Sequence, residues 1–141
     1  MTSELPGRTT AFRIAEVRPQ VNGIILKRLF KEGGDVKEGQ QLYQIDPSVY
    51  EATLKSAEAN LQSTKSISDR YKQLVNEQAV SRQEYDTAVA NRLQSEASLQ
   101  SAQINLRYTK VLSPLTGRIG RSSVTEGALV SNGQALSLIH I

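Results

Sequence analysis

Two stretches of this chain, 94 residues apart, repeat one another without a gap. Residues 17–45 align with residues 111–139, and ten of the 29 aligned positions are identical. Glycines and the apolar residues around them are kept together, which indicates two copies of one structural unit. The identical pairs are Val17/Val111, Gly23/Gly117, Ile25/Ile119, Glu32/Glu126, Gly33/Gly127, Val36/Val130, Gly39/Gly133, Gln40/Gln134, Leu42/Leu136 and Ile45/Ile139.

Each copy has the pattern of short β-strands separated by glycine turns. Apolar residues alternate roughly with polar ones, and glycine adopts turn conformations that other residues avoid. A unit of about 30 residues made of short strands buries little apolar surface alone. We therefore expect residues 17–46 and 111–141 to be two halves of one small β-sandwich, interrupted in the sequence. The structural turn glycines are expected to be Gly23, Gly33, Gly39, Gly117, Gly127 and Gly133.

The segment between the copies, residues 47–110, has the pattern of two helices. Asp46, Pro47 and Ser48 form a helix-start signal, and apolar or small residues then recur at spacings of four and three, as in a coiled-coil seam. Ser81 and Glu84 have the spacing of a capping box, which would start a second helix after a break. We expect an antiparallel coiled-coil hairpin with its tip near residues 75–81, and an α+β fold in which this hairpin interrupts the sandwich. The expected seam residues are Tyr50, Leu54, Ala57, Leu61, Thr64, Ser68, Tyr71 and Val75, then Tyr85, Ala88, Ser95, Leu99, Ala102 and Leu106, with Arg92 interrupting the second run and Leu93 outside it.

The composition argues against most catalytic and cofactor chemistry. The chain has no cysteine and one histidine, His140, so disulfides, thiolate metal sites and a Ser–His–Asp site are not expected. Glu32 and Asp35 fall in a predicted turn without a partner, where we expect them to be solvated. The net charge of +3 is spread evenly along the chain, without a basic face that would bind nucleic acid. We expect no enzyme activity, no cofactor and no metal.

Three stretches, taken together and in order, resemble the periplasmic adaptor proteins, also called membrane fusion proteins, of tripartite multidrug efflux pumps. The resemblance is to the AcrA/MexA type that serves resistance–nodulation–division (RND) transporters, within the HlyD-like superfamily. It implies that the split β-domain is a lipoyl (biotinyl-like) domain. It also implies that several copies associate into a ring, and that the hairpin reaches an outer-membrane channel of the TolC type. The stretches are ELPGRTTAFRIAEVRPQVNGIILKRLFKEGGDVKEGQQLYQIDP, residues 70–85, and INLRYTKVLSPLTGRIGRSSVTEGALVSNGQA.

The resemblance further implies that three residues at the hairpin tip dock to the channel: Arg70, Leu74 and Ser81. Arg70 and Leu74 are four residues apart and share one face of the first helix, and Ser81 begins the second helix. A charged donor, an apolar anchor and a small polar group would then meet at the tip. The alternative interpretation is structural: Leu74 closes the last layer of the hairpin, and Ser81 only caps a helix.

Against the family pattern, we expect the chain to be a fragment. We expect neither a signal peptide nor a lipid-anchor cysteine among its residues, and residues 1–16 resemble the first strands of the membrane-proximal and β-barrel region without their partners. The full-length parent would lie in the periplasm at the inner membrane and would contact the RND transporter through domains largely missing here. Two alternatives stay open. One is the adaptor of a type I secretion or ABC-type exporter; the more remote one is a lipoyl or biotin carrier domain, although no lysine stands in a suitable turn.

Overall fold

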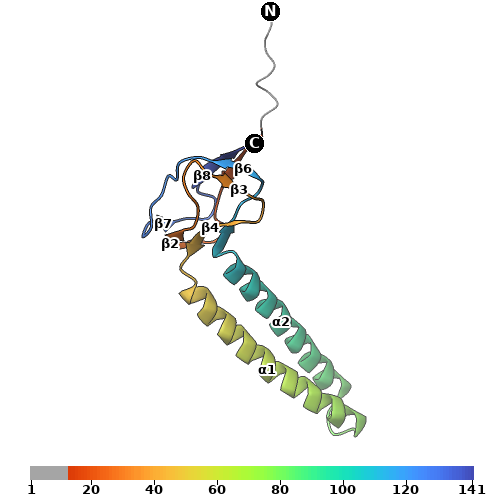
Figure 1. The fold of residues 1–141 in the computed structure, drawn as a ribbon. Coiled ribbons are helices and arrows are strands. Elements are labelled where there is room, and N and C mark those ends of the chain that lie inside the picture. Colours follow the sequence, from red (N-terminus) through yellow and green to blue (C-terminus); the bar gives the residue numbers. More distant parts are fainter. Residues whose placement is uncertain (1–12) are drawn as a thin grey trace, which may run out of the picture. The chain divides into compact units, whose positions relative to one another are not determined.

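The computed structural model describes residues 13–141. The chain divides into a β unit, made of residues up to Asp46 together with Tyr108–Ile141, and a helical unit, Pro47–Arg107 (Figure 1). This arrangement confirms the α+β class. The strands are β1 (Ile14–Val17), β2 (Gly23–Arg28), β3 (Asp35–Val36), β4 (Gln41–Ile45), β5 (Lys110–Leu112), β6 (Gly117–Ile119), β7 (Leu129–Val130) and β8 (Ser137–His140), and the helices are α1 (Ser48–Asn76) and α2 (Arg82–Arg107).

The repeat in the sequence corresponds to a relation between two sheets. The β unit contains two four-stranded sheets with the strand orders β1-β8-β6-β3 and β5-β4-β2-β7. A shift of 94 residues carries β2 onto β6 and β3 onto β7, and makes β4 overlap β8 and β1 overlap β5. One sheet is therefore the repeat copy of the other, with the strands in the same order.

The apolar identities of the repeat form the core of the β unit. Each of them is at most 5% exposed, so burial of these side chains supplies the main driving force for closing the two copies on each other. The backbone pairing repeats as well, because the Leu29 N–H donates to the Leu42 carbonyl and the Ser123 N–H donates to the Leu136 carbonyl, both at 2.8 Å. The buried pairs are Val17/Val111, Ile25/Ile119, Val36/Val130, Leu42/Leu136 and Ile45/Ile139.

The repeated glycines serve two different purposes. Four of them have φ between 79° and 92°, a left-handed conformation that favours glycine: Gly33, Gly39, Gly127 and Gly133. Gly23 and Gly117, expected in turns, instead begin β2 and β6. A Cβ at Gly117 would overlap the His140 carbonyl oxygen, and a Cβ at Gly23 would lie 2.5 Å from Ile45 Cγ2. These two positions need glycine because a neighbouring strand approaches closely, which no local sequence pattern reveals.

The repeated glutamates tie the two copies together. Glu32 Oε2 accepts the Ser122 N–H at 2.8 Å, and Glu126 Oε2 accepts the Arg28 N–H at 3.2 Å. Arg28 and Ser122 are themselves one repeat offset apart, so the two bonds are equivalent. The Arg28 guanidinium also pairs with Glu32 at 3.0 Å. The expectation that Glu32 and Asp35 have no partner was therefore wrong. The partner of Glu32 lies 90 residues away in the sequence, and Asp35 Oδ1 lies 3.7 Å from Arg118 Nε on the neighbouring strand.

The two ends of the β unit differ from the expected boundaries. Residues 1–12 of the predicted unpaired strands lie outside the described residues. The remainder of that segment is not unpaired, because β1 runs antiparallel to β8, with Ile14 opposite His140 and Val17 opposite Ser137. The hairpin ends at Arg107 rather than at residue 110, since Lys110 pairs with Gln44 at the edge of the second sheet.

The helical unit is a thin two-helix seam. α1 has 29 residues and α2 has 26, and the four buried positions are small: Ser68, Ala88, Ser95 and Ala102. Two polar contacts cross the seam, from Asn60 Nδ2 to Ser95 Oγ at 3.2 Å and from Arg92 Nη1 to Ser68 Oγ at 3.5 Å. Arg92 thus enters the seam rather than only interrupting it. Within residues 13–141, neither helix is apolar enough over its length to cross a membrane.

Candidate functional site

The end of α1 is closed by a backbone motif centred on Gln78. The Ala79 N–H donates to the Leu74 carbonyl at 2.8 Å, and the Gln78 N–H donates to the Val75 carbonyl at 3.1 Å. This is the Schellman pattern, in which the residue after the helix is left-handed and usually glycine. Here Gln78 occupies that position with φ 59°. Sequence reasoning missed this feature because glutamine gives no signal for a left-handed turn.

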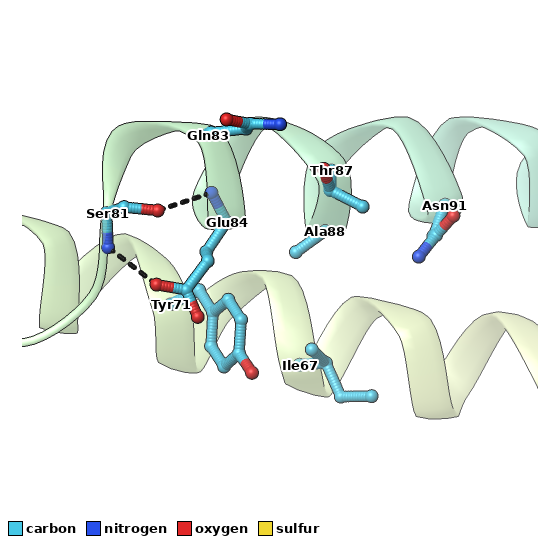
Figure 2. Close-up of a pocket in the computed structure, with 8 residues that line it drawn as sticks. All are labelled: Ile67, Tyr71, Ser81, Gln83, Glu84, Thr87, Ala88 and Asn91. Atoms are coloured by element: carbon cyan, nitrogen blue, oxygen red, sulfur yellow. Dashed lines mark hydrogen bonds between the residues drawn. The ribbon is translucent and has the colours of Figure 1, made fainter.

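The start of α2 has the capping box expected from the sequence. The Glu84 N–H donates to Ser81 Oγ at 3.0 Å, and the Ser81 N–H donates to Glu84 Oε1 at 2.9 Å (Figure 2). The Ser81 N–H, and to a smaller extent the Ser81 hydroxyl, bonds to the Glu84 carboxylate and thereby lowers the pKa of Glu84. Ser81 is exposed, so the residue that caps the helix is also accessible at the tip.

The two α1 residues expected at the tip lie along one side of the helix. Arg70 is exposed and Leu74 is half-buried, one turn further on. No salt bridge involves Arg70 in the part of the chain that the structure describes. The guanidinium is therefore available to an external acceptor, while Leu74 offers apolar surface next to it.

A groove of about 480 Å³ lies between the helices beside the tip (Figure 2). Ile67 and Tyr71 of α1 and Ala88 of α2 provide its apolar surface, and Ser81 lines its tip end. Tyr71 comes four residues after Ile67, and Leu74 three residues after Tyr71, so all three lie on the same face of α1. We call this feature the tip groove; its lining residues are Ile67, Tyr71, Ser81, Gln83, Glu84, Thr87, Ala88 and Asn91.

The tip groove is suited to binding rather than to catalysis. It combines small, apolar and uncharged polar groups with one carboxylate, Glu84, which already holds the Ser81 N–H. Over residues 13–141 there is no cluster of side chains with the composition of a metal site. Sequence reasoning missed the groove. Its signal in the sequence was Ile67, an apolar residue just before the seam position Ser68.

Comparison with known families decides what kind of protein carries this hairpin. Residues 13–141 match the family described as RND MFP, barrel-sandwich hybrid domain. The chain belongs to this RND membrane fusion protein family. The match covers both the β unit and the hairpin, and it confirms the resemblance inferred from the sequence.

Curated relatives of this chain carry names that refer to efflux pumps or to multidrug resistance. The antibiotic efflux pump periplasmic linker protein ArpA of Pseudomonas putida is 78% identical over 134 residues, which make up 95% of this chain and 36% of ArpA. The multidrug resistance protein MexA of Pseudomonas aeruginosa is 72% identical over 135 residues, or 96% of this chain and 35% of MexA. The chain thus spans about a third of the length of these relatives.

Solved structures share the same architecture. A MacA–MexA chimeric protein that contains the Pseudomonas aeruginosa MexA α-hairpin domain matches with a TM-score of 0.82 and 44% identity, over 91% of this chain and 47% of that one. A putative efflux transporter from Bacteroides eggerthii matches with a TM-score of 0.87 and 28% identity, over 92% of this chain and 40% of that one. The split β unit with its helical hairpin is therefore an arrangement found in both.

Proposed function

We propose that this chain is the hairpin-bearing part of a periplasmic adaptor of an RND efflux system. The adaptor would link an inner-membrane RND transporter to a TolC-type outer-membrane channel, without catalysing a reaction. The observation that carries the proposal is the 78% identity to a protein named as an efflux pump periplasmic linker, over 95% of this chain. The transporter contact is assigned to the two thirds of such relatives that this chain does not cover.

The tip of the hairpin is the part that would dock to the channel. Arg70 supplies a guanidinium with several N–H donors, which suits carboxylates and carbonyl oxygens of a partner. Leu74 supplies an apolar anchor, and Ser81 supplies an accessible small polar group beside the tip groove. Each contact is small, so binding would depend on several adaptors acting together in a ring, where every further contact becomes intramolecular.

Crosslinking tests the docking of the tip to a channel. The chain has no cysteine, so Ala79→Cys gives a single exposed site for a photo-reactive label at the tip. We expect the labelled chain to crosslink to a purified TolC-type channel, and the crosslink to be lost in Arg70→Asp. Lys72→Asp is the matched control, because it makes the same charge change two residues away, roughly 200° around the helix.

The control separates docking from general electrostatic attraction. If Arg70→Asp and Lys72→Asp reduce the crosslink equally, the chain is attracted by its charge and Arg70 has no specific role. If the folded chain, tethered in several copies to one multivalent scaffold so that the tips act together, gives no crosslink at all, the proposed tip contact is wrong. Circular dichroism of each variant establishes that the hairpin is folded before the comparison.

A further inference from the structure

The two halves of the β unit are interleaved strand by strand. Residues up to Asp46 provide β1 to β4, and residues from Tyr108 onwards provide β5 to β8. Among the strands that the structure describes, four of the six pairings join one half to the other: β1 with β8, β2 with β7, β3 with β6 and β4 with β5. These contacts are noncovalent, since the chain has no cysteine. Each half therefore needs a complementary half, which its own chain or a second copy could supply.

The turn at the hairpin tip determines which half is paired with which. It consists of residues 77–81, between the end of α1 and the start of α2. From residue 48 to residue 113 the chain contains no glycine and no proline, so nothing in the tip sequence breaks a helix. The turn depends instead on Gln78 at φ 59°, which is unfavourable for a residue with a Cβ, and on the capping box of Ser81 and Glu84.

A straight helix through the tip would keep the seam almost in register. Seam residues recur in α1 and in α2 at alternating spacings of three and four. After Val75 the same spacings lead to Gln78, Arg82 and Tyr85, and Tyr85 is itself a seam residue of α2. One irregular step follows, a spacing of three between Tyr85 and Ala88 where four is due, and a coiled coil absorbs such a step by local overwinding. One continuous helix would thus present a single seam along its length.

Two such straight helices, running antiparallel, bring opposite charges together at the tip. In the closed hairpin Ser68 faces Arg92, with 3.5 Å between Ser68 Oγ and Arg92 Nη1. Continuing this pairing towards the tip places residue 77 level with residue 82, to within one residue. In a pair formed by two copies, Glu77 of each copy therefore lies level with Arg82 of the other. Arg82 is 77% exposed and contacts Asp86 at the surface, so its guanidinium has donors left for a second carboxylate.

We propose that two copies of this chain exchange halves through the tip. Each copy straightens residues 77–81 into helix, so that α1 of one copy pairs with α2 of the other. Each β unit then combines the residues up to Asp46 of one copy with the residues from Tyr108 of the other. The contacts of the closed chain outside the tip are re-formed between copies, which makes the exchange of identical elements an accessible route to a dimer. The proposal goes beyond the proposed function and does not depend on it.

The exchanged dimer differs from the closed chain at the tip. Gln78 leaves its left-handed conformation, and Ser81 gives up its capping bonds because it now lies inside a helix. The partner half must come from solution, whereas the half of the same chain is tethered and has a high effective concentration. The closed chain therefore predominates when the protein is dilute, and the dimer forms when the chain folds at high concentration. The turn is the element that keeps the chain closed and its tip exposed.

A double variant, Ile67→Cys with Thr87→Cys, tests which chains are paired. The two residues line the tip groove from α1 and from α2, so a short thiol-to-thiol crosslinker joins helices that are packed together (Figure 2). The chain is refolded from urea at high concentration, and a dimer is isolated by size-exclusion chromatography with light scattering. On a denaturing gel we expect two joined chains, because α1 and α2 of each pair come from different copies. Crosslinked single chains, or no dimer at any concentration, would overturn the proposal.

Ile67→Cys alone is the matched control. In the exchanged dimer its two thiols lie roughly 35 Å apart along the helix pair, beyond the reach of a short reagent. Joined chains from this single variant would overturn the exchange, since they would mean that two closed hairpins meet through this face. Circular dichroism of the reduced variants checks that the helices are intact in monomer and dimer.

Changes at the tip should shift the monomer–dimer equilibrium in opposite directions. Gln78→Gly relieves the closed turn and weakens a continuous helix, so it should raise the dissociation constant of the dimer by at least about tenfold for each of the two tips. Ser81→Ala removes a cap that only the closed chain uses, and should lower that constant by about fivefold for each tip. Gln78→Ala is the control, since alanine does not relieve the positive φ, and it should not raise the constant.

The tip variants also separate the exchange from other kinds of dimer. A dissociation constant indifferent to Gln78→Gly would overturn the proposal, because the tip would then not be the hinge. No channel is present in these measurements. Failure of the exchange would therefore leave the docking of the tip to a channel untouched, and a failed crosslink to a channel would leave the exchange untouched.

Discussion

Replacing Gln78 by glycine should stabilise the hairpin, although Gln78 lies at its proposed docking tip. Gln78 has φ 59°, and a left-handed conformation costs a non-glycine residue about 1–2 kcal/mol. Glycine in turn lowers the free energy of unfolding by about 0.4–1 kcal/mol, because it gives the unfolded chain more conformational freedom. The difference leaves Gln78→Gly more stable by about 0.5–1 kcal/mol. The two Schellman hydrogen bonds involve only backbone atoms and are retained.

Thermal unfolding followed by far-ultraviolet circular dichroism measures this difference. For a chain of this size, Tm should rise by about 1–4 °C in Gln78→Gly. Gln78→Ala is the matched control, since alanine removes the side chain but is as unfavourable as glutamine at positive φ. Its Tm should stay near that of the original chain. If alanine and glycine have the same effect, the side chain and not the backbone conformation determines the stability of the tip.

Three further predictions concern the repeat and the seam. In urea unfolding, Gly117→Ala should lower the free energy of unfolding by about 3 kcal/mol and Gly23→Ala by about 1 kcal/mol. An added Cβ at Gly117 meets the His140 backbone, which cannot move aside, whereas at Gly23 it meets the end of the Ile45 side chain, which can. The hydrogen bond from the Ser122 N–H lowers the pKa of Glu32 below its ordinary 4.5. The ionised carboxylate therefore stabilises the fold above pH 4.5, and this stabilisation is lost as the pH falls through the lowered pKa. The Tm of Glu32→Gln should fall less on acidification than the Tm of the original chain. Replacing both Ser68 by Ala and Arg92 by Leu should raise the Tm of the hairpin, because a desolvated polar pair gives way to apolar packing, whereas Ser68→Ala alone should not.

The sequence was most informative where the repeat duplicates a buried residue. Val36 and Val130, or Leu42 and Leu136, occur twice in the same setting of turns, so their burial followed from the pattern. The helix boundaries near Ser48 and Ser81 were equally accessible, because helix-start signals are local. These features depend on neighbours within a few residues, which a single sequence displays directly.

The features that were missed depend on contacts between distant residues. Glu32 looks like a solvated turn residue until the second copy brings the Ser122 N–H to it. Gly117 looks like turn punctuation until the end of β8 comes close to it. The strand β1 had no visible partner because its pairing with β8 crosses more than 100 residues of chain. At the tip, Gln78 gave no sign of positive φ, since its conformation is imposed by the end of α1.

A transplanted hairpin gives the sharpest test of docking at the tip. Residues 47–107 would replace the hairpin of a full-length adaptor such as ArpA, in a strain whose own adaptor gene is deleted, with antibiotic susceptibility as the measurement. If Arg70 docks to the channel, the transplanted hairpin restores resistance, Arg70→Asp abolishes it, and Lys72→Asp retains it. Restored resistance that is indifferent to Arg70→Asp would contradict docking through this residue, and so would a folded, expressed chimera that restores none.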